Sequence, residues 1–194
     1  MSALDEQTRE NLCVELRRVH EELGTTTMHV SHNFEETLAV ADRIGIISDG
    51  RMRQVGTVED VFRRPNSEFV ARFVRADNLL RGRASRKNGG LEVRVGELAL
   101  QGSGGPEGEV FLVVRPEDVG VARETEKGRP NLVTGRIAEI VNRGALMRVD
   151  IDVQAGLMVK ALMTRRAFLT QGLAKGEVVS AFFDPSSTYV FSAN

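Results

Sequence analysis

Residues 29–50 read HVSHNFEETLAVADRIGIISDG. A β-branched run over residues 25–30 comes just before His32, and a helical pattern opens behind Asn33, a residue type that favours helix N-caps. A second short apolar run follows at residues 44–47 and is closed by a turn signal. The order strand, helix, strand predicts a parallel βαβ unit.

The flanking segments are predicted to be helical. Apolar residues recur at helical spacing over residues 5–23, with Asp5 at the N-cap position and Gly24 at the end. The helix behind Asn33 is expected to bury apolar residues, namely Phe34, Leu38 and Ala41. Two short helices are expected further on, the first behind a capping box framed by Thr57 and Asp60 and the second behind Ser67.

The pattern changes near residue 77, where helical periodicity stops and short apolar runs alternate with glycine-rich turns. The runs that read as strands are residues 91–95, 110–114, 135–141, 145–153, 157–163 and 178–183. Short strands at regular spacing predict a small β-barrel or sandwich. The chain is therefore expected to contain an α/β part over residues 1–76 and an all-β part over residues 77–194.

The composition narrows the function classes. The net charge is −1, and residues 77–194 hold 16 Lys/Arg against 14 Asp/Glu, without the strong basic bias of a nucleic-acid binder. The chain has a single cysteine, Cys13, so no disulfide framework exists. No apolar run approaches the ~18 residues needed to span a bilayer, and no signal peptide opens the chain. We expect a cytoplasmic protein that reaches a membrane only through a partner.

The histidine segment resembles the switch-histidine segment of ABC-transporter ATPases. The stretch SALD at residues 2–5 resembles their D-loop, and residues 50–57 and 69–73 resemble the end of the nucleotide-binding domain in the importer group. That group carries maltose, polyamines, sulfate, iron, or molybdate and tungstate. The resemblance implies that His32 contacts the γ-phosphate of ATP, and that Ser2 and Asp5 act at the nucleotide across an ATP-bound homodimer. It also implies ATP and magnesium as cofactors and membrane-spanning permease subunits as partners.

The β-rich part resembles the TOBE domain, an OB-like module of importer ATPases. Arg115-Pro116-Glu117 matches its Arg-Pro-Glu element, and the segment 135–191 is closer to the molybdate- and tungstate-type version. This resemblance implies a regulatory and dimerisation domain with candidate oxyanion ligands, Thr164, Ser186, Ser187 and Lys160. The family tends to have lysine where this chain has Asp184, and a carboxylate there opposes an anion.

Three motifs of a working ATPase are absent from the sequence. There is no G-x-x-x-x-G-K-[ST] loop to hold phosphates and magnesium, no apolar strand ending in acidic residues before residue 2, and no Leu-Ser-Gly-Gly-Gln signature. We therefore expect the chain to be the C-terminal part of an ATP-binding subunit, either an expressed fragment or a truncated gene product. By itself it is expected to bind no cofactor and to hydrolyse no ATP, and no metal site is predicted.

Several alternatives stay open. His32 can be a plain surface histidine in a loop, and Asp5 a plain helix cap. The hydroxyls of the β-rich part can be ordinary strand and turn residues. His20 is expected to be solvated, and the basic run at residues 81–87 to flank a loop. For the whole chain, the alternatives are a non-catalytic oxyanion-binding or interaction module, and an OB-type nucleic-acid binder. The last fits poorly, because the chain has no Trp and one Tyr to stack on bases.

Overall fold

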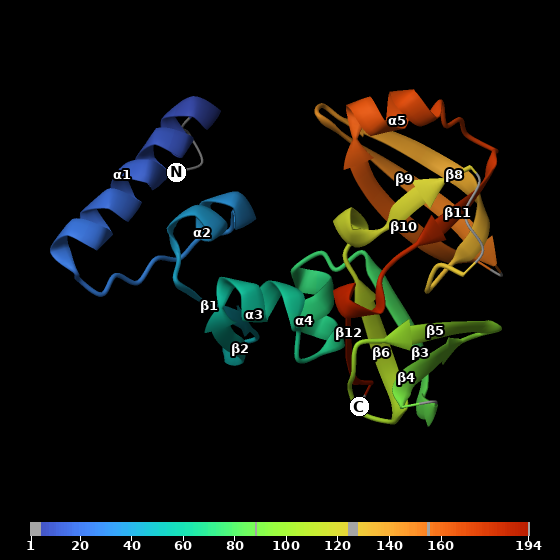
Figure 1. The fold of residues 1–194 in the computed structure, drawn as a ribbon. Coiled ribbons are helices and arrows are strands. Elements are labelled where there is room, and N and C mark those ends of the chain that lie inside the picture. The colour runs from blue at the N-terminus through green and yellow to red at the C-terminus, as the bar shows by residue number, and fades with distance from the viewer. Residues whose placement is uncertain (1–4, 88, 124–127, 155, 194) are drawn as a thin grey trace. The chain divides into compact units, whose positions relative to one another are not determined.

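The computed structural model describes residues 5–87, 89–123, 128–154 and 156–193. The chain divides into two compact units, Met1–Phe62 and Arg63–Asn194. Figure 1 labels the elements of both units, and each unit is described by itself. The boundary expected near residue 77, where the sequence pattern changes, stays a prediction. Within the described residues, no helix is long and apolar enough to cross a membrane.

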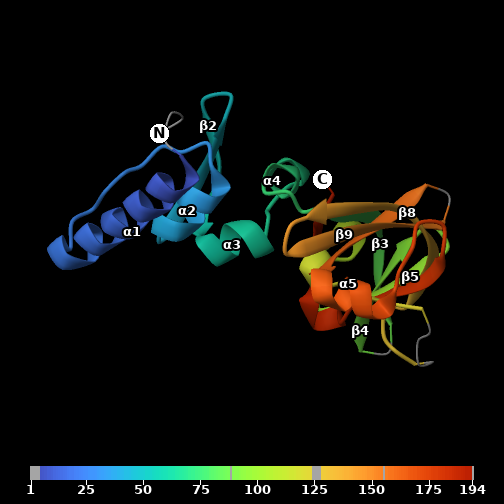
Figure 2. The same cartoon turned by 90° about the horizontal axis from the view of Figure 1, so that it is seen from above.

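The first unit consists of helices and one hairpin. Its elements are α1 Glu6–Leu23, α2 Phe34–Val40, β1 Arg43–Ser48 and β2 Arg51–Thr57, and α3 Val58–Arg63 begins in it. The predicted caps are confirmed: Asp5 accepts from the amide of Thr8, and Gly24 ends α1 in the left-handed conformation, with φ 59°. Figure 2 shows α2 beside α1, and the two helices are in contact.

The predicted parallel βαβ unit is not formed in the described residues. Residues 25–30 form no strand, and Met28 and Val30 are 94% and 82% exposed. β1 pairs only with β2, in antiparallel register, because Asp49 and Gly50 both adopt positive φ and close a tight hairpin. A strand needs a neighbour to satisfy its backbone groups, and this unit provides none for residues 25–30.

Burial on α2 also differs from the prediction. Leu38 is 46% exposed, whereas Glu36 is buried. The helix therefore turns a carboxylate rather than a leucine toward the inside of the unit.

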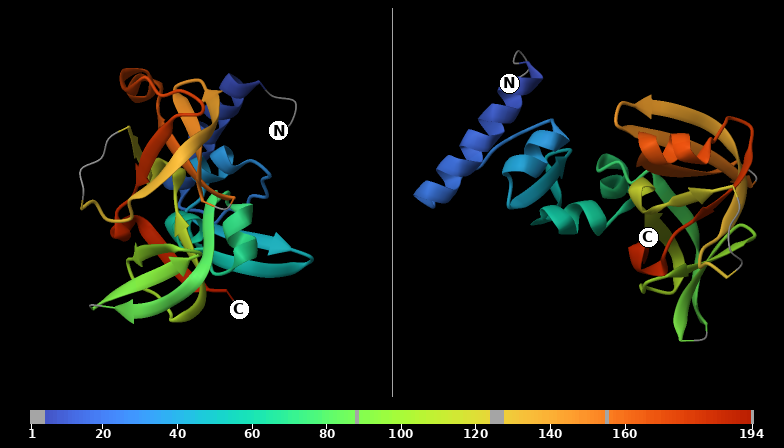
Figure 3. Two further views of the ribbon diagram at one scale, coloured as in Figure 1. Left: turned by 90° about the vertical axis from the view of Figure 1, so that its right-hand side faces the viewer. Right: turned by 45° about the horizontal axis from the view of Figure 1, so that its top comes forward.

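The second unit is mostly β-sheet. Its elements are α4 Glu68–Phe73, β3 Asn78–Lys87, β4 Gly90–Val95, β5 Leu98–Gly102, β6 Gly108–Val114, η1 Pro116–Asp118, β7 Gly120–Ala122, β8 Val133–Arg143, β9 Leu146–Gln154, β10 Leu157–Thr164, α5 Arg165–Gln171, β11 Val178–Phe182, η2 Pro185–Ser187 and β12 Thr188–Ser192. All six predicted strands are present. The six predicted strands did not include β3, β5, β7 and β12. The helix α5, which lies against β9 and β10, was not predicted either (Figure 3).

The missed β3 changes the interpretation of the basic run at residues 81–87. These residues lie on a ten-residue strand in the middle of a sheet, and the run ends where β3 ends, before the connection to β4. Leu80 and Ala84 point into the core, while Arg81 and Arg83 between them are exposed. Alternation with period two explains both the basic run and its solvation.

The strands form two five-stranded sheets, in the orders β12-β6-β3-β4-β5 and β7-β11-β8-β9-β10. The two orders match strand for strand, which shows an internal duplication of the unit. Each half contributes four strands to one sheet, and its last strand crosses to the other sheet. β7 thus completes the sheet of the second half, and β12 completes the sheet of the first half.

Equivalent residues support the duplication. Residues 78–83 read NLLRGR, and residues 131–136 read NLVTGR. The glycine of each run allows a close approach of two strands: a Cβ on Gly82 would lie 2.3 Å from the carbonyl oxygen of Arg94, and one on Gly135 would lie 2.5 Å from that of Asp152. Backbone atoms cannot yield as side chains do, so both positions require glycine.

The asparagine of each run joins the two sheets. Asn78 is 1% exposed; its amide donates to the carbonyl of Lys160 at 2.8 Å, and its Oδ1 accepts from the amide of Lys160 at 2.7 Å. Asn131 makes the same pair of bonds with Gln101, at 2.9 and 2.6 Å. Lys160 and Gln101 lie on β10 and β5, which are edge strands of their sheets. We call these two contacts the asparagine clasps.

Candidate functional site

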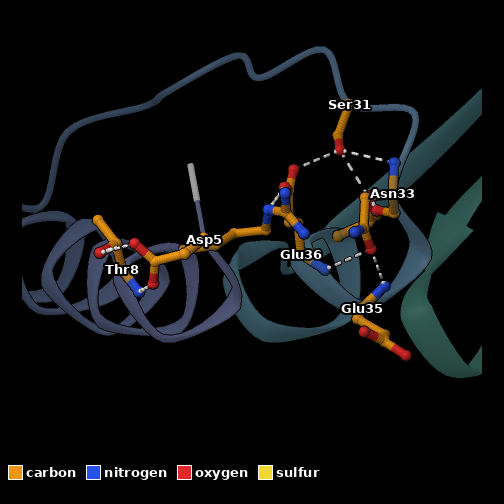
Figure 4. Close-up of polar contacts among 8 residues, drawn as sticks. Asp5, Thr8, Ser31, Asn33, Glu35 and Glu36 are labelled. Atoms are coloured by element: carbon orange, nitrogen blue, oxygen red, sulfur yellow. Dashed lines mark hydrogen bonds and ion pairs between the residues drawn. The ribbon is translucent and has the colours of Figure 1, made fainter. Parts of the chain in front are cut away.

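In the histidine loop, residues 31–36, the side chains and amides around His32 are hydrogen-bonded to one another (Figure 4). The side chain of Asn33 caps α2 by accepting from the amides of Glu35 and Glu36, at 2.8 and 3.2 Å. The hydroxyl of Ser31 accepts from the amide of Asn33 at 3.0 Å. His32 is therefore held between two residues whose positions are fixed by the start of the helix.

Glu36 connects this loop to α1. Its carboxylate accepts from the Ser31 hydroxyl at 2.8 Å and forms an ion pair with Nε of Arg9 at 3.3 Å. The Glu36 side chain is only 9% exposed, so its charge requires such partners. The same carboxylate adds to the effect of burial in raising the pKa of the neighbouring Cys13 thiol. The link between Glu36 and Arg9 could not be read from the spacing of residues in the sequence.

The start of α1 carries another predicted site residue. The carboxylate of Asp5 accepts from the amide and the hydroxyl of Thr8, both at 2.9 Å (Figure 4). These bonds hold the pKa of Asp5 below its usual range, so Asp5 is an ionised cap. Ser2 lies outside the described residues.

The three histidines differ in their surroundings. His32 and His29 are exposed, and neither side chain forms a hydrogen bond or ion pair within the described residues. His20 was expected to be solvated, but its ring lies 2.9 Å from the carbonyl oxygen of Thr25 and 3.1 Å from the carboxylate of Asp42. Since both partners are acceptors, both contacts become hydrogen bonds only when both ring nitrogens are protonated. His20 thus connects the end of α1 to the loop that follows it.

The family resemblance implies a nucleotide site at this loop, and the group available to contact a phosphate is the imidazole of His32. The amides of Glu35 and Glu36 at the start of α2 already donate to the side chain of Asn33. The exposed imidazole of His32 fits a phosphate contact by its donor chemistry. In the described residues, no three His, Cys, Asp or Glu side chains gather to hold a metal ion.

The candidate oxyanion ligands lie at different places in the second unit. Thr164 ends β10, whereas Ser186 and Ser187 lie in η2, which contacts β5 in the other sheet. Lys160 also lies on β10, and its ammonium group is 3.7 Å from a carboxylate oxygen of Asp77. The fold thus separates the lysine and threonine from the two serines within one chain.

Most of these hydroxyls have structural partners. Thr164 caps α5 by accepting from the amide of Ala167 at 3.2 Å. The Ser186 hydroxyl donates to Asp184 at 2.8 Å, and the Ser186 amide donates to the same oxygen at 3.0 Å. These bonds lower the pKa of Asp184, which keeps a negative charge beside the serine.

Arg115, the first residue of the Arg-Pro-Glu element, has a positioning role. Its guanidinium donates to the carbonyls of Val74 and Arg75 at 3.1 and 3.3 Å, at the end of α4. Burial lowers its pKa. The Arg-Pro-Glu element therefore joins the last helix before the sheets to η1. The repeated runs NLLRGR and NLVTGR were the signal in the sequence that could have indicated the duplication and both clasps.

Comparison with known proteins agrees with this organisation. The family model of the TOBE domain matches residues 112–191. Among solved structures, a molybdate-bound form of the cytoplasmic molybdate-binding protein ModG covers 59% of this chain and 95% of its own, with a TM-score of 0.53 and 19% identity. At that identity the likeness shows the fold alone. It confirms the prediction of an OB-like β domain.

Curated relatives match nearly the whole chain. The molybdate/tungstate import ATP-binding protein WtpC of Pyrococcus horikoshii is 38% identical over 97% of this chain and 53% of its own length. The sulfate/thiosulfate import ATP-binding protein CysA 2 of Chromobacterium violaceum is 34% identical, over 92% of this chain and 49% of its own. The spermidine/putrescine import ATP-binding protein PotA of Marinobacter nauticus is 36% identical, over 83% and 44%.

The chain spans about half the length of these relatives. It corresponds to the C-terminal, TOBE-containing region of the ATP-binding subunits of ABC importers.

Proposed function

We propose that this member of the importer ATP-binding family supplies two parts of an ABC ATPase, a switch histidine and a TOBE-type regulatory domain. The observation that carries the proposal is the similarity to WtpC over 97% of the chain, including the histidine loop. In a subunit that also contains the phosphate-binding loop, His32 would contact the γ-phosphate of ATP bound with magnesium. Residues 1–76 would be the end of the α/β nucleotide-binding domain, and residues 77–194 the TOBE domain.

The geometry of the loop supports the role of His32. Its imidazole is exposed, while Ser31 and Asn33 on either side are fixed by hydrogen bonds. A preorganised donor of this kind contributes to phosphoryl transfer by stabilising charge in the transition state. Ser2 and Asp5 would lie where the family's D-loop meets the partner subunit. Asp5 would then both cap α1 and face the partner.

The proposed partners follow from the family. Two ATP-binding subunits would form a homodimer around ATP, and permease subunits would hold the dimer at the cytoplasmic face of the membrane. The names of the relatives support molybdate, tungstate or sulfate as the solute, with polyamines as the alternative. No nucleic-acid partner is proposed.

The decisive experiment measures ATP turnover in a full-length subunit that carries this chain. His32→Ala is expected to lower the rate by ~10²–10³, the usual effect of losing one preorganised donor, and to leave nucleotide binding intact. His29→Ala is the matched control, since His29 is equally exposed and lies three residues earlier. Parental turnover in His32→Ala would contradict the assignment. The 194-residue chain alone is expected to release no phosphate above a protein-free control.

We also propose that the second unit self-associates and that its hydroxyls are candidates for an oxyanion between protomers. Within one chain, Thr164 and Lys160 lie apart from Ser186 and Ser187, so a shared site needs a second copy. Asp184 opposes it, because an ionised carboxylate repels an oxyanion by roughly 1–4 kcal/mol a few ångströms away. Dimerisation is the better-supported part. Light scattering tests it, and calorimetry with molybdate, tungstate and sulfate tests the anion.

A further inference from the structure

The second unit contains a hollow of about 420 Å³ whose charged lining is mostly basic. Four arginines line it: Arg75, which follows α4, Arg115, which precedes η1, Arg143 on β8 and Arg148 on β9. Two carboxylates, Asp77 and Glu117, share the lining, which leaves four positive charges against two negative, or +2. None of the four arginines was among the predicted site residues.

Two of these arginines are held in place by the fold. The Arg115 guanidinium donates to the carbonyls of Val74 and Arg75, at 3.1 and 3.3 Å. Nε of Arg148 donates to the buried carboxylate of Asp150 at 2.9 Å, and the Arg148 side chain is 19% exposed. A guanidinium has five N–H donors, so one that the fold holds through some of them can still offer others to a ligand. Fixing them beforehand reduces the entropy lost on binding.

Arg143 supplies a charge that the fold does not use. It lies at the end of β8, beside the hairpin turn to β9, and its exposed side chain forms no hydrogen bond or ion pair within the described residues. The negative charge of Asp77 in the lining is partly offset by the ammonium group of Lys160, which lies 3.7 Å from the carboxylate. Arg148 is partly offset by Asp150 and Glu139. Arg143 is therefore the group whose removal should affect a bound anion most cleanly.

Because the unit is duplicated, the turn that carries Arg115 can be compared with its equivalent in the other half. η1 and η2 are equivalent turns, each opened by a proline after the cap residue, but the cap is Arg115 in η1 and Asp184 in η2. The two ends of the unit therefore carry opposite charges at this position. Arg115 also holds the end of α4 through the carbonyls of Val74 and Arg75, so it is both a structural contact and part of the basic lining.

We propose that this hollow binds a small organic polyanion, a molecule with two or more phosphate or carboxylate groups. The planar guanidinium of arginine can donate two parallel hydrogen bonds to the oxygens of a phosphate or of a carboxylate. The volume falls in the range of ~300–1,000 Å³ found for pockets that hold small organic molecules. Pro116 and Leu162 add an apolar wall against which a carbon skeleton can pack. The inference needs only the second unit and does not depend on the ATPase proposal.

Calorimetry on the 194-residue chain tests it with two probes, fructose 1,6-bisphosphate and citrate, with molybdate for comparison. At least one organic probe should bind at millimolar concentration or below. Arg143→Gln should weaken it by about tenfold, the effect of losing one charge-assisted contact. Arg83→Gln is the control, because Arg83 is equally exposed but lies on β3 outside the hollow.

The alternative outcomes would overturn the proposal. These are no binding of either probe at millimolar concentration, binding of molybdate alone, or equal weakening by Arg83→Gln and Arg143→Gln. Because Arg143 is exposed, its substitution should leave the thermal unfolding of the unit unchanged, which separates loss of binding from loss of fold. Arg148→Gln is a second variant that should weaken binding in the same direction.

Discussion

At the scale of single residues, the histidine loop depends on one buried carboxylate. Glu36 lies on α2, yet its two partners are Ser31 in the loop and Arg9 on α1. Around it most side chains of the first unit are exposed. A single charge thus joins the segment that carries His32 to the helix that begins at Asp5.

Glu36→Gln should destabilise the first unit by about 1–3 kcal/mol, because the neutral side chain leaves the guanidinium of Arg9 without its charged partner. Urea unfolding followed by helical circular dichroism measures the change. Glu35→Gln is the control, since Glu35 is exposed on the same helix. Faster amide exchange over residues 31–37 should accompany the loss. Equal midpoints for the two variants would mean that Glu36 does not hold the loop.

Glu177 provides a test of pH dependence. Its carboxylate accepts from the amide of Ala174 at 2.8 Å and from Arg123 at 2.6 Å, and these bonds lower its pKa from the ordinary value of 4.5. A carboxyl whose folded pKa is lowered stabilises the fold above its unfolded pKa, and this contribution is lost as pH falls through the folded pKa.

The stability difference between the parent chain and Glu177→Gln should therefore be constant at neutral pH and shrink below about pH 4.5. Denaturant midpoints of the second unit over an acid titration measure it. Glu97→Gln, at an exposed turn, should follow the parent at every pH. A difference that stayed constant into acid would show that the two hydrogen bonds do not lower the carboxyl's folded pKa.

At the scale of elements, the asparagine clasps protect two sheet edges. β5 and β10 are edge strands, and each has one amide and one carbonyl bonded to an asparagine from the opposite sheet. An unpaired edge is a template for pairing with another chain. The clasps both close the unit and occupy part of each edge.

Asn78→Ala should cost on the order of 2–4 kcal/mol, since it leaves the amide and carbonyl of Lys160 without their partner. Thermal unfolding of the second unit measures the loss, and light scattering should show more aggregation on heating. Asn142→Ala is the control: Asn142 also bonds a backbone amide, that of Gly144, but in an exposed turn. A loss no larger than that of the control would disprove the structural role of the clasp.

At the scale of the whole molecule, the two units differ in how they are built. The second has a large hydrophobic core that contains side chains from both sheets, beside a smaller cluster around Phe111 and Phe191, and each sheet takes a strand from the other half of the repeat. The first has a single hairpin and many exposed apolar side chains, among them Val14, Leu23 and Ile47. Because the halves of the second unit are interleaved, neither half should fold without the other.

We therefore expect urea to unfold the chain in two transitions, the first unit at the lower concentration. A chain limited to residues 63–194 should keep the second transition with an unchanged midpoint. Circular dichroism for the helices and Tyr189 fluorescence for the sheets can separate the two events, because Tyr189 is the single tyrosine and lies on β12. One common transition for both probes would contradict this independence.

Local patterns in the sequence were enough to predict several elements. The caps at Asp5, Asn33 and Ser67 are bonds between near neighbours, so residue type and spacing determine them. The six apolar runs of the β-rich part alternate with turn residues, and each is a strand in the structure. The family resemblance could also be recognised from the sequence, because each of its motifs is a short continuous stretch of residues.

What the sequence by itself determined, then, is where helices and strands begin and that residues 77–194 form a β domain. Only the tertiary structure decided which strands pair, and so residues 25–30 formed no strand while β3 became the centre of a sheet. It also decided that Arg9 meets Glu36, that Asn78 meets Lys160, and that four arginines line one hollow. The physical reason is that caps and turns depend on neighbours in the chain. Strand pairing, burial of charge and the lining of a pocket depend on residues that only the folded chain brings together.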